Sequence, residues 1–492
     1  MGSTTGYAAN WICSGTDYWS NTTCWASGIP PVAGDSVIFQ QSSASDRTIN
    51  YDNISNPTAV FGEVRIDGTG GGTVTFSHDS NLDFNADSLF LGRDGLGTLN
   101  QSNGRVAVGA GTIGARTGSL GVYNASGLAS SQWGTLHIGY IGIGQFNQSG
   151  GSVMVNSVLS IGGENGGVGS YSLTGGSLTV NGEVNVGRWG SGSFYQDGGT
   201  HTVNGVLYIA RKAGPLGAPA TGTYTLDSGT LNATSMEVGV IPRVASAGSN
   251  TFPDVHEASN GHFIQNGGTV NIAGGLLVSS SGGAVGRYEL NDGSLVASQI
   301  TNNDTFEYRG GAISGNVTNR DLFAVSGPGI RTIQGDLTNV GTSFFSQADY
   351  AETKHGLITL ADGTQMSITQ NLTLEDDGTL AIELGTLFYG TTSEWISVGA
   401  TADLGGVLDL REAMGFNPAV GDSWTLLSAT TLMGTFSDVW FPVVPNWVWS
   451  LTYTDQEVIL SGSASAVPVP AALWLFGSGL FALIGVARRR TL

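Results

Sequence analysis

The sequence predicts an all-β protein: a right-handed parallel β-helix (a solenoid) with three strands per coil of about 23–25 residues, a C-terminal β segment and one C-terminal transmembrane helix. Three observations predict this fold. A glycine recurs at a nearly constant interval through the middle of the chain, and the short runs between these glycines alternate apolar and polar residues. No run in that region has the period of a helix, so stacked β coils are the way to bury the apolar faces.

The composition fits a glycine-rich β protein. Glycine accounts for 77 of 492 residues, which is about twice its usual share. Charged residues make up 11% and the net charge is −20, so the chain lacks the basic surface that nucleic acid requires. A hydrophobic content of 40% argues against disorder.

Residues 1–60 are predicted to cap the solenoid. They contain Trp11, Trp19 and Trp25, then a Pro/Gly turn at 28–31 and a short apolar strand. The first coil of a solenoid has an open strand edge, and a cap covers it.

Residues 61–345 are predicted to form the β-helix repeats, with one marker glycine in each unit. From one marker to the next the sequence number rises by 23, 24, 25, 23, 30, 39 and 25 in turn. The two largest steps predict loops at 211–220 and 241–260. About ten coils stacked at 4.8 Å would give a rod of roughly 50 Å. The marker glycines are Gly104, Gly127, Gly151, Gly176, Gly199, Gly229, Gly268 and Gly293.

Two further positions repeat within the units. Five residues before each marker, an apolar and usually aromatic residue is predicted to stack along the axis; these are Leu99, Val122, Phe146, Tyr171, Phe194, Tyr224, Phe263 and Tyr288. Three residues before the marker, amides such as Gln101, Asn124 and Gln148 recur. These amides predict either a hydrogen-bonded ladder or a half-buried row that merely fills space.

Residues 346–463 are predicted to form a C-terminal β domain. The repeat becomes irregular from about residue 305, and after residue 347 alternating strands with a different spacing follow. Trp440, Trp447, Trp449 and Tyr453 are expected to close its core. A linker of small residues then leads to the tail.

Residues 464–492 are predicted to be a sorting tail. The segment 471–487 carries no charge and, as a helix of roughly 25 Å, is at the low end of what spans a bilayer core; counting back to Val467 gives 21 uncharged residues, which is enough. Arg488, Arg489 and Arg490 follow it and should stay on the cytoplasmic side, which puts the body outside the cytoplasm. A buried core helix is the weaker alternative, because such a helix rarely lacks charge on every face.

The tail resembles a PEP-CTERM sorting signal. Val467, Pro468, Val469 and Pro470, the apolar helix and the arginine cluster carry this resemblance, with Val469 where the family has Glu. The resemblance implies an exosortase as partner and a Gram-negative host that makes exopolysaccharide and biofilm. It also implies an inner-membrane-anchored precursor that is released to the cell surface or matrix. The Trp-rich opening and the C-terminal β segment are similar to autotransporter-like surface repeats.

An exported chain of this kind needs a signal peptide, and none is visible at the start of this sequence, so we expect the native start to lie upstream. Export also bears on Cys13 and Cys24, whose close spacing predicts a disulfide; two free thiols are the alternative. The two cysteines have no histidine nearby to complete a zinc site.

No catalytic or cofactor motif stands out. The six histidines are scattered, and the Gly-x-Gly runs are predicted turns. Asp83, Asn85 and Asp87 share a strand face and offer oxygens that suit Ca²⁺, although a solvated face is the simpler interpretation. We therefore expect no cofactor beyond this weak calcium possibility.

Two functions follow from these observations. The first is a non-catalytic surface or biofilm-matrix protein that contacts exopolysaccharide or neighbouring surface proteins. The second is a carbohydrate-active enzyme, a polysaccharide lyase or hydrolase, with its site in the two long loops. No carboxylate recurs in a fixed repeat position, which favours the first.

Overall fold

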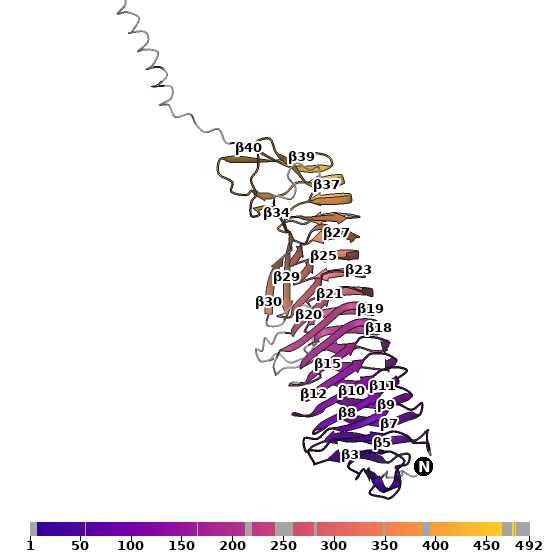
Figure 1. Ribbon diagram of the computed structural model, residues 1–492. Coiled ribbons are helices and arrows are strands. Elements are labelled where there is room, and N and C mark those ends of the chain that lie inside the picture. Colours follow the sequence, from indigo (N-terminus) through magenta and orange to yellow (C-terminus); the bar gives the residue numbers. More distant parts are fainter. Residues whose placement is uncertain are drawn as a thin grey trace, which may run out of the picture.

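The computed structural model describes residues 7–54, 56–164, 166–211, 219–241, 259–279, 283–347, 350–385, 394–464, 475, 476 and 478. Over these residues the protein is nearly all β, and Figure 1 shows an elongated stack of strands. The other regular structure in this part of the chain is the 3₁₀ turn η1, Thr22–Cys24, and the helical residues 475, 476 and 478.

One column of strands runs the length of the stack. Each strand pairs in parallel with the next. Within the described ranges the column holds seventeen strands and, at ~4.8 Å per step, is about 77 Å long. The stack is therefore longer than the roughly ten coils expected from the marker glycines. The strands are β2 (Gly15–Tyr18), β4 (Arg47–Asn50), β6 (Val74–His78), β8 (Leu96–Gln101), β10 (Leu120–Ala125), β12 (Ile143–Gln148), β15 (Val168–Leu173), β18 (Ser191–Arg211), β19 (Ala220–Val240), β20 (Ser259–Gln265), β22 (Val285–Leu290), β24 (Thr305–Tyr308), β26 (Leu322–Val325), β31 (Leu357–Leu360), β34 (Thr379–Leu384), β36 (Val407–Glu412) and β38 (Asp438–Trp440).

The remaining strands of the coils pair in parallel beside this column. In the long strands β18 and β19 all three faces of a coil are joined without a break. The strands are β1 (Ala8–Asn10), β3 (Ser36–Gln41), β5 (Val60–Gly68), β7 (Asp83–Leu91), β9 (Arg105–Ile113), β11 (Ser130–Ile138), β13 (Ser152–Val155), β14 (Leu159–Ile161), β16 (Ser177–Val180), β17 (Val184–Val186), β21 (Thr269–Val278), β23 (Ser294–Asn302), β25 (Ala312–Asn319), β27 (Gly329–Gln334), β28 (Leu337–Asn339), β32 (Thr364–Ile368), β33 (Leu372–Leu374), β35 (Ile396–Leu404) and β37 (Ser423–Gly434).

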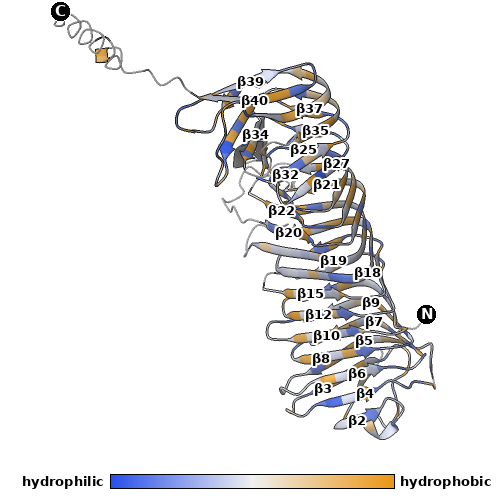
Figure 2. Cartoon of the chain, turned by 45° about the horizontal axis from the view of Figure 1, so that its top comes forward, coloured by the Kyte–Doolittle hydropathy of each residue, from blue (hydrophilic) through white to orange (hydrophobic). Residues whose placement is uncertain are grey.

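The core lies inside the stack because alternate residues of each strand point inward. Figure 2 shows this alternation as orange and blue bands along the strands. Among the described residues, nine aromatic rings stack in one inner column, with neighbouring centroids 4.5 to 5.1 Å apart. This confirms the predicted aromatic column from Phe146 onward. The rings are Tyr123, Phe146, Tyr171, Phe194, Tyr224, Phe263, Tyr288, Phe306 and Phe323.

The expected register is wrong by one residue in the second unit. Tyr123, not Val122, pairs with Leu99 and Phe146. The cause is a shorter turn: Ala125 lies opposite Gln101, yet it stands only two residues before its marker glycine. The inner residue of that unit is therefore Ala125 and not Asn124.

The inner glutamines do not stack on one another. They occur in alternate coils, separated by Ala125, Leu173 and Leu226. Each accepts a hydrogen bond from the tyrosine of the following coil at 2.5 to 2.7 Å; the pairs are Tyr123–Gln101, Tyr171–Gln148, Tyr224–Gln196 and Tyr288–Gln265. An amide ladder does exist on the outer surface, where Asn147 donates to Asn124 and Asn124 to Asn100, each at 2.8 Å.

Aromatic residues cover both ends of the stack. Trp11, Trp19 and Trp25 are buried against one another at the N-terminal end, with ring centroids 5.0 and 5.1 Å apart. At the other end β39 (Trp447–Tyr453) and β40 (Glu457–Ala464) pair antiparallel with each other, and β40 pairs antiparallel with β37. Antiparallel strands at this end stop the parallel pairing. Trp447, Trp449 and Tyr453 are partly buried there, but Trp440 is 53% exposed, so the expectation that Trp440 helps to close the core is wrong.

Parallel pairing runs through the expected domain boundaries at residues 60 and 345. β26 pairs directly with β31, so the hairpin β29 (Thr342–Gln347) and β30 (Tyr350–His355) is an insertion between two adjacent coils. Figure 1 shows this hairpin lying along the side of the stack. The division into domains itself stays a prediction.

The sorting residues Val467, Pro468, Val469, Pro470, Arg488, Arg489 and Arg490 lie outside the described residues. Among the residues that the structure describes, no helix is long and apolar enough to cross a membrane. The transmembrane helix at 471–487 therefore stays a prediction from the sequence.

Candidate functional site

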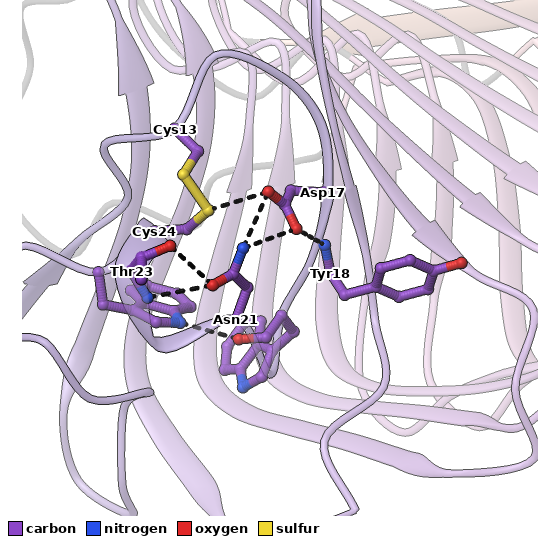
Figure 3. Close-up of a disulfide and its surroundings, with 8 residues drawn as sticks. Cys13, Asp17, Tyr18, Asn21, Thr23 and Cys24 are labelled. Carbon is purple, nitrogen blue, oxygen red and sulfur yellow. Dashed lines mark hydrogen bonds between the residues drawn. A yellow bond between two sulfur atoms is a disulfide. The ribbon is translucent and has the colours of Figure 1, made fainter.

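Cys13 and Cys24 form a disulfide bond at the N-terminal end of the stack. Figure 3 shows Asp17 beside this bond, with one carboxylate oxygen 3.3 Å from the Cys24 sulfur. Asn21 donates to both oxygens of Asp17 at 3.0 Å. Cys13, Asp17 and Cys24 are the one group of three potential metal ligands found among the described residues. Both sulfurs are used in the disulfide, so this group does not offer thiolate ligands.

The Asp83, Asn85 and Asp87 face carries a basic side chain. Arg105 of the next coil places one guanidinium nitrogen 3.7 Å from an Asp83 carboxylate oxygen and 3.4 Å from the Asn85 amide oxygen. Asp87 is exposed. A guanidinium between the first two oxygens occupies the place where a calcium ion would bind them, so this geometry favours an ordinary polar strand face.

A charged network lies on the outer face of β20, β22 and β24. Glu289 lies 2.7 Å from His262, 3.0 Å from Arg287 and 2.8 Å from Arg309. Burial would raise the pKa of Glu289, but the His262 hydrogen bond and the two arginines lower it below its ordinary value. Glu307 pairs with the same two arginines. Because these charges pair with one another, the network supports the stack and offers no free acid or base.

A different set of polar residues gathers on the outer face of the third strand of the coil, which is the last strand segment before the chain turns into the next coil. Five of these segments lie side by side. Strand pairing places His137, Ser160, Asn185, Tyr208 and Glu237 in one row across β11, β14, β17, β18 and β19. The corners that follow these strands add further side chains, and we call the whole set the outer cluster. Its corner and flanking members, which contact the row or one another, are Tyr140, Glu164, Glu183, Arg188, Trp189 and Arg211.

The corner residues of the outer cluster are set by repeated backbone hydrogen bonds. The amide nitrogens of Tyr140, Arg188 and Arg211 each donate to the carbonyl of a glycine one coil earlier, at 2.9 to 3.1 Å. Tyr140, Arg188 and Arg211 therefore occupy equivalent positions in their coils. The repeat aligns them even though their side chains differ.

Aromatic rings and arginines stack in the outer cluster. The Arg188 guanidinium carbon lies 4.6 Å from the centre of the Trp189 ring, and that of Arg211 lies 4.1 Å from the centre of the Tyr208 ring. Arg211 also forms an ion pair with Glu183 at 2.9 Å. These contacts hold flat, half-buried groups in place against the outer surface.

Burial shifts the pKa values of two acidic groups and of the histidine in the outer cluster. Burial raises the pKa of Glu237 above its ordinary value, and the Arg211 charge opposes this only in part. Burial also raises the pKa of Glu164, opposed by Tyr140 and Arg188. Burial lowers the pKa of His137, and the charge of Arg188 lowers it further. His137 is therefore neutral at pH 7.

Several buried polar atoms of the outer cluster have no hydrogen-bond partner among the described residues. Ser160 and Asn185 are fully buried, and the Ser160 hydroxyl oxygen and the Asn185 amide oxygen are unpartnered. The same holds for one ring nitrogen of His137, the indole nitrogen of Trp189, and the Nε atoms of Arg188 and Arg211. A buried polar group without a partner costs about 1–3 kcal/mol, so such a gathering indicates a place where a ligand or water supplies the bonds.

No family model matches the chain, and neither a curated protein nor a solved structure matches it.

The two long loops proposed for an enzyme site lie largely outside the described residues, at 212–218 and 242–258. The outer cluster was not predicted from the sequence. Its members come from successive coils, far apart along the chain, and differ from one coil to the next, so no column of identical residues marks them. The available signal was the register: residues 136–138, 159–161 and 184–186 each read apolar-x-apolar before a glycine, and aligning these steps puts their middle residues in one row.

Proposed function

We propose that this chain is an exported, non-catalytic protein of the cell surface or biofilm matrix, built as a right-handed parallel β-helix that acts as a stiff spacer. The observation that carries this proposal is the parallel column of seventeen strands from β2 to β38. A stack in which every coil contacts only its neighbours extends in one dimension, as repeat proteins do.

The covered ends support a secreted rod. Uncovered strand edges would template end-to-end association; the tryptophan cap lies at the N-terminal end, and β40 pairs antiparallel with β37 at the other end. The Cys13–Cys24 disulfide supports an oxidising compartment, because such bonds form outside the reducing cytosol. The outer surface rich in Ser, Thr and Asn suits contact with polysaccharide or with other surface proteins.

The proposed route to the surface rests on the tail. We propose that an exosortase recognises residues 467–470, the following helix anchors the precursor in the inner membrane, and cleavage releases the body. One epitope tag in the body and a second at the extreme C-terminus test this route in a host that carries an exosortase. The body tag should leave the membrane fraction while the C-terminal tag does not. Both tags staying in the inner membrane would contradict processing.

The non-catalytic part of the proposal has its own test. The purified chain is incubated with exopolysaccharide from the producing host, and reducing ends and unsaturated uronates are measured over time. We expect neither to appear above the level with boiled protein. Release of either would favour the lyase or hydrolase, for which the outer-cluster carboxyl groups Glu164 and Glu237, with their raised pKa values, are the first candidates as proton donors.

A further inference from the structure

We propose that the outer cluster is a binding site for a neutral polysaccharide segment. The inference rests on the proposed surface function and names its ligand class and its residues. Its starting point is the row of third strands, which presents one side chain per coil at a spacing of ~4.8 Å. That spacing is close to the length of one hexose unit, so an extended saccharide lying along the stack meets a new coil with each sugar.

The cluster has a buried floor and a half-exposed rim. The floor is formed by Ser160 and Asn185, both fully buried, each with an oxygen that lacks a hydrogen-bond partner among the described residues. The rim is formed by Tyr140, Arg188 and Trp189, which are each partly exposed. A sugar hydroxyl both donates and accepts a hydrogen bond, so it can satisfy either floor oxygen once the rim side chains that cover that oxygen move aside.

The rim groups suit the other hydroxyl oxygens, the ring oxygen and the C–H face of a sugar. Trp189 has an indole N–H and Arg188 an Nε–H that are both buried and have no partner among the described residues, and Arg188 forms no ion pair among them. Both are donors for ring and hydroxyl oxygens. The aromatic rings of Tyr140 and Trp189 offer apolar surface to the C–H face of a sugar. Mixed donors, acceptors and aromatic rings are what recognition of a polyhydroxylated ligand needs.

The charges favour a neutral saccharide over an acidic one. Glu164, Glu183 and Glu237 outnumber Arg188 and Arg211 in the cluster, and the whole chain has a net charge of −20. A uronate polymer would be repelled by this field, whereas a neutral sugar accepts hydrogen bonds from the arginines and donates to the carboxylates. Glu183 is already in an ion pair with Arg211.

The experiment begins with the purified full chain on a printed array of neutral and acidic glycans. We expect binding to neutral glycans. The strongest neutral glycan is then titrated calorimetrically against the wild type and three variants. Ser160→Ala should weaken binding roughly fivefold through the loss of one hydrogen bond, and Trp189→Ala roughly tenfold through the loss of its ring. Arg188→Gln should weaken it by a similar factor.

Matched controls separate binding from folding. Ser172→Ala changes a half-exposed outer serine elsewhere on the stack, and Trp440→Ala removes an exposed tryptophan at its far end. Both should bind like the wild type. Ser160→Ala should also keep or raise the melting temperature, since it removes an unpartnered buried hydroxyl.

Binding to acidic glycans alone, binding to no glycan, or unchanged affinity in both Ser160→Ala and Trp189→Ala would overturn the inference. None of these results would change the location of the protein in the tagging experiment, so the inference and the proposed function fail independently.

Discussion

The corner after the third strand is built in two ways along the stack. In the earlier coils a glycine with positive φ makes the turn, as at Gly139 (φ 67°) and Gly162 (φ 71°). In the later coils the third strand ends in a buried asparagine, and Asn302, Asn319 and Asn339 form a continuous ladder with amide contacts of 2.7 and 2.8 Å. The ladder asparagines are 17 and 20 residues apart, so these coils are shorter than the glycine-cornered ones.

The two kinds of corner have different physical requirements. The glycine corner favours a residue without a side chain, because the backbone of the next coil passes where a Cβ would be. The asparagine corner is a hydrogen-bond solution: Asn319 donates to the carbonyls of Asp321 and Leu357, at 2.7 and 3.2 Å, as well as to the next asparagine. A shorter coil leaves fewer residues for the turn, and the amide side chain closes it.

Adding a methyl group at a glycine corner should have the largest effect. In Gly139→Ala the new Cβ would lie 2.1 Å from the Val168 carbonyl oxygen, in a backbone conformation that disfavours alanine. We expect a loss of about 3–5 kcal/mol in the free energy of unfolding, measured by chemical denaturation. Gly275→Ala is the control, because its nearest neighbour is 3.7 Å away and its φ is not positive. Equal effects at both sites would refute the steric explanation.

Interrupting the asparagine ladder should cause the second-largest loss of stability. Leucine occupies the same column in the following coil, at Leu374, so Asn319→Leu is sterically reasonable. It removes every side-chain hydrogen bond of Asn319 and leaves the amides of Asn302 and Asn339 each without one partner. We expect a loss of about 3 kcal/mol by urea unfolding. A variant as stable as the wild type would show that the ladder only fills space.

A buried histidine tests what a polar side chain does in an apolar part of the core. His201 lies between Leu178 and Leu231, and burial lowers its pKa to about 3. In the unfolded state His201 binds a proton below about pH 6.5. Its contribution to the free energy of unfolding is therefore complete above that pH and is lost as the pH falls toward 3.

His201→Leu should therefore remove about 2 kcal/mol of the stability difference between pH 7 and pH 5. The Tyr224 hydroxyl keeps its hydrogen bond to Gln196 in this variant. Unfolding midpoints of the two proteins at both pH values measure the effect. An unchanged pH dependence would mean that His201 is protonated without cost in the folded state.

The smallest expected effect is a gain in stability and not a loss. Ala210 occupies a glycine corner position with φ 54°, so Ala210→Gly should relieve strain and stabilise the protein by about 1 kcal/mol. Ala233→Gly, in an ordinary strand position of β19, should instead destabilise it by about 0.5–1 kcal/mol. The difference in melting temperature between these two variants checks the sign.

The repeat and the aromatic column were predictable because one residue type marks each of them. The register at Tyr123 was not, since a turn one residue shorter moves the pairing without changing the glycine spacing much. The coils before residue 61 and after residue 345 were missed because they pair like the others while lacking the marker glycines. The outer cluster was missed because pairing, and not sequence similarity, brings its residues together.

Continuity of the stack across the hairpin β29–β30 is the central claim, and engineered cysteines test it most directly. Leu322 and Leu357 are paired neighbours on either side of the hairpin, at a separation that suits a disulfide. The double variant Leu322→Cys, Leu357→Cys should form a new disulfide on mild oxidation, seen by peptide mass spectrometry. Leu322→Cys with Thr379→Cys, two coils apart, should not. No bond in the first variant, or equal bonding in both, would contradict a single continuous stack.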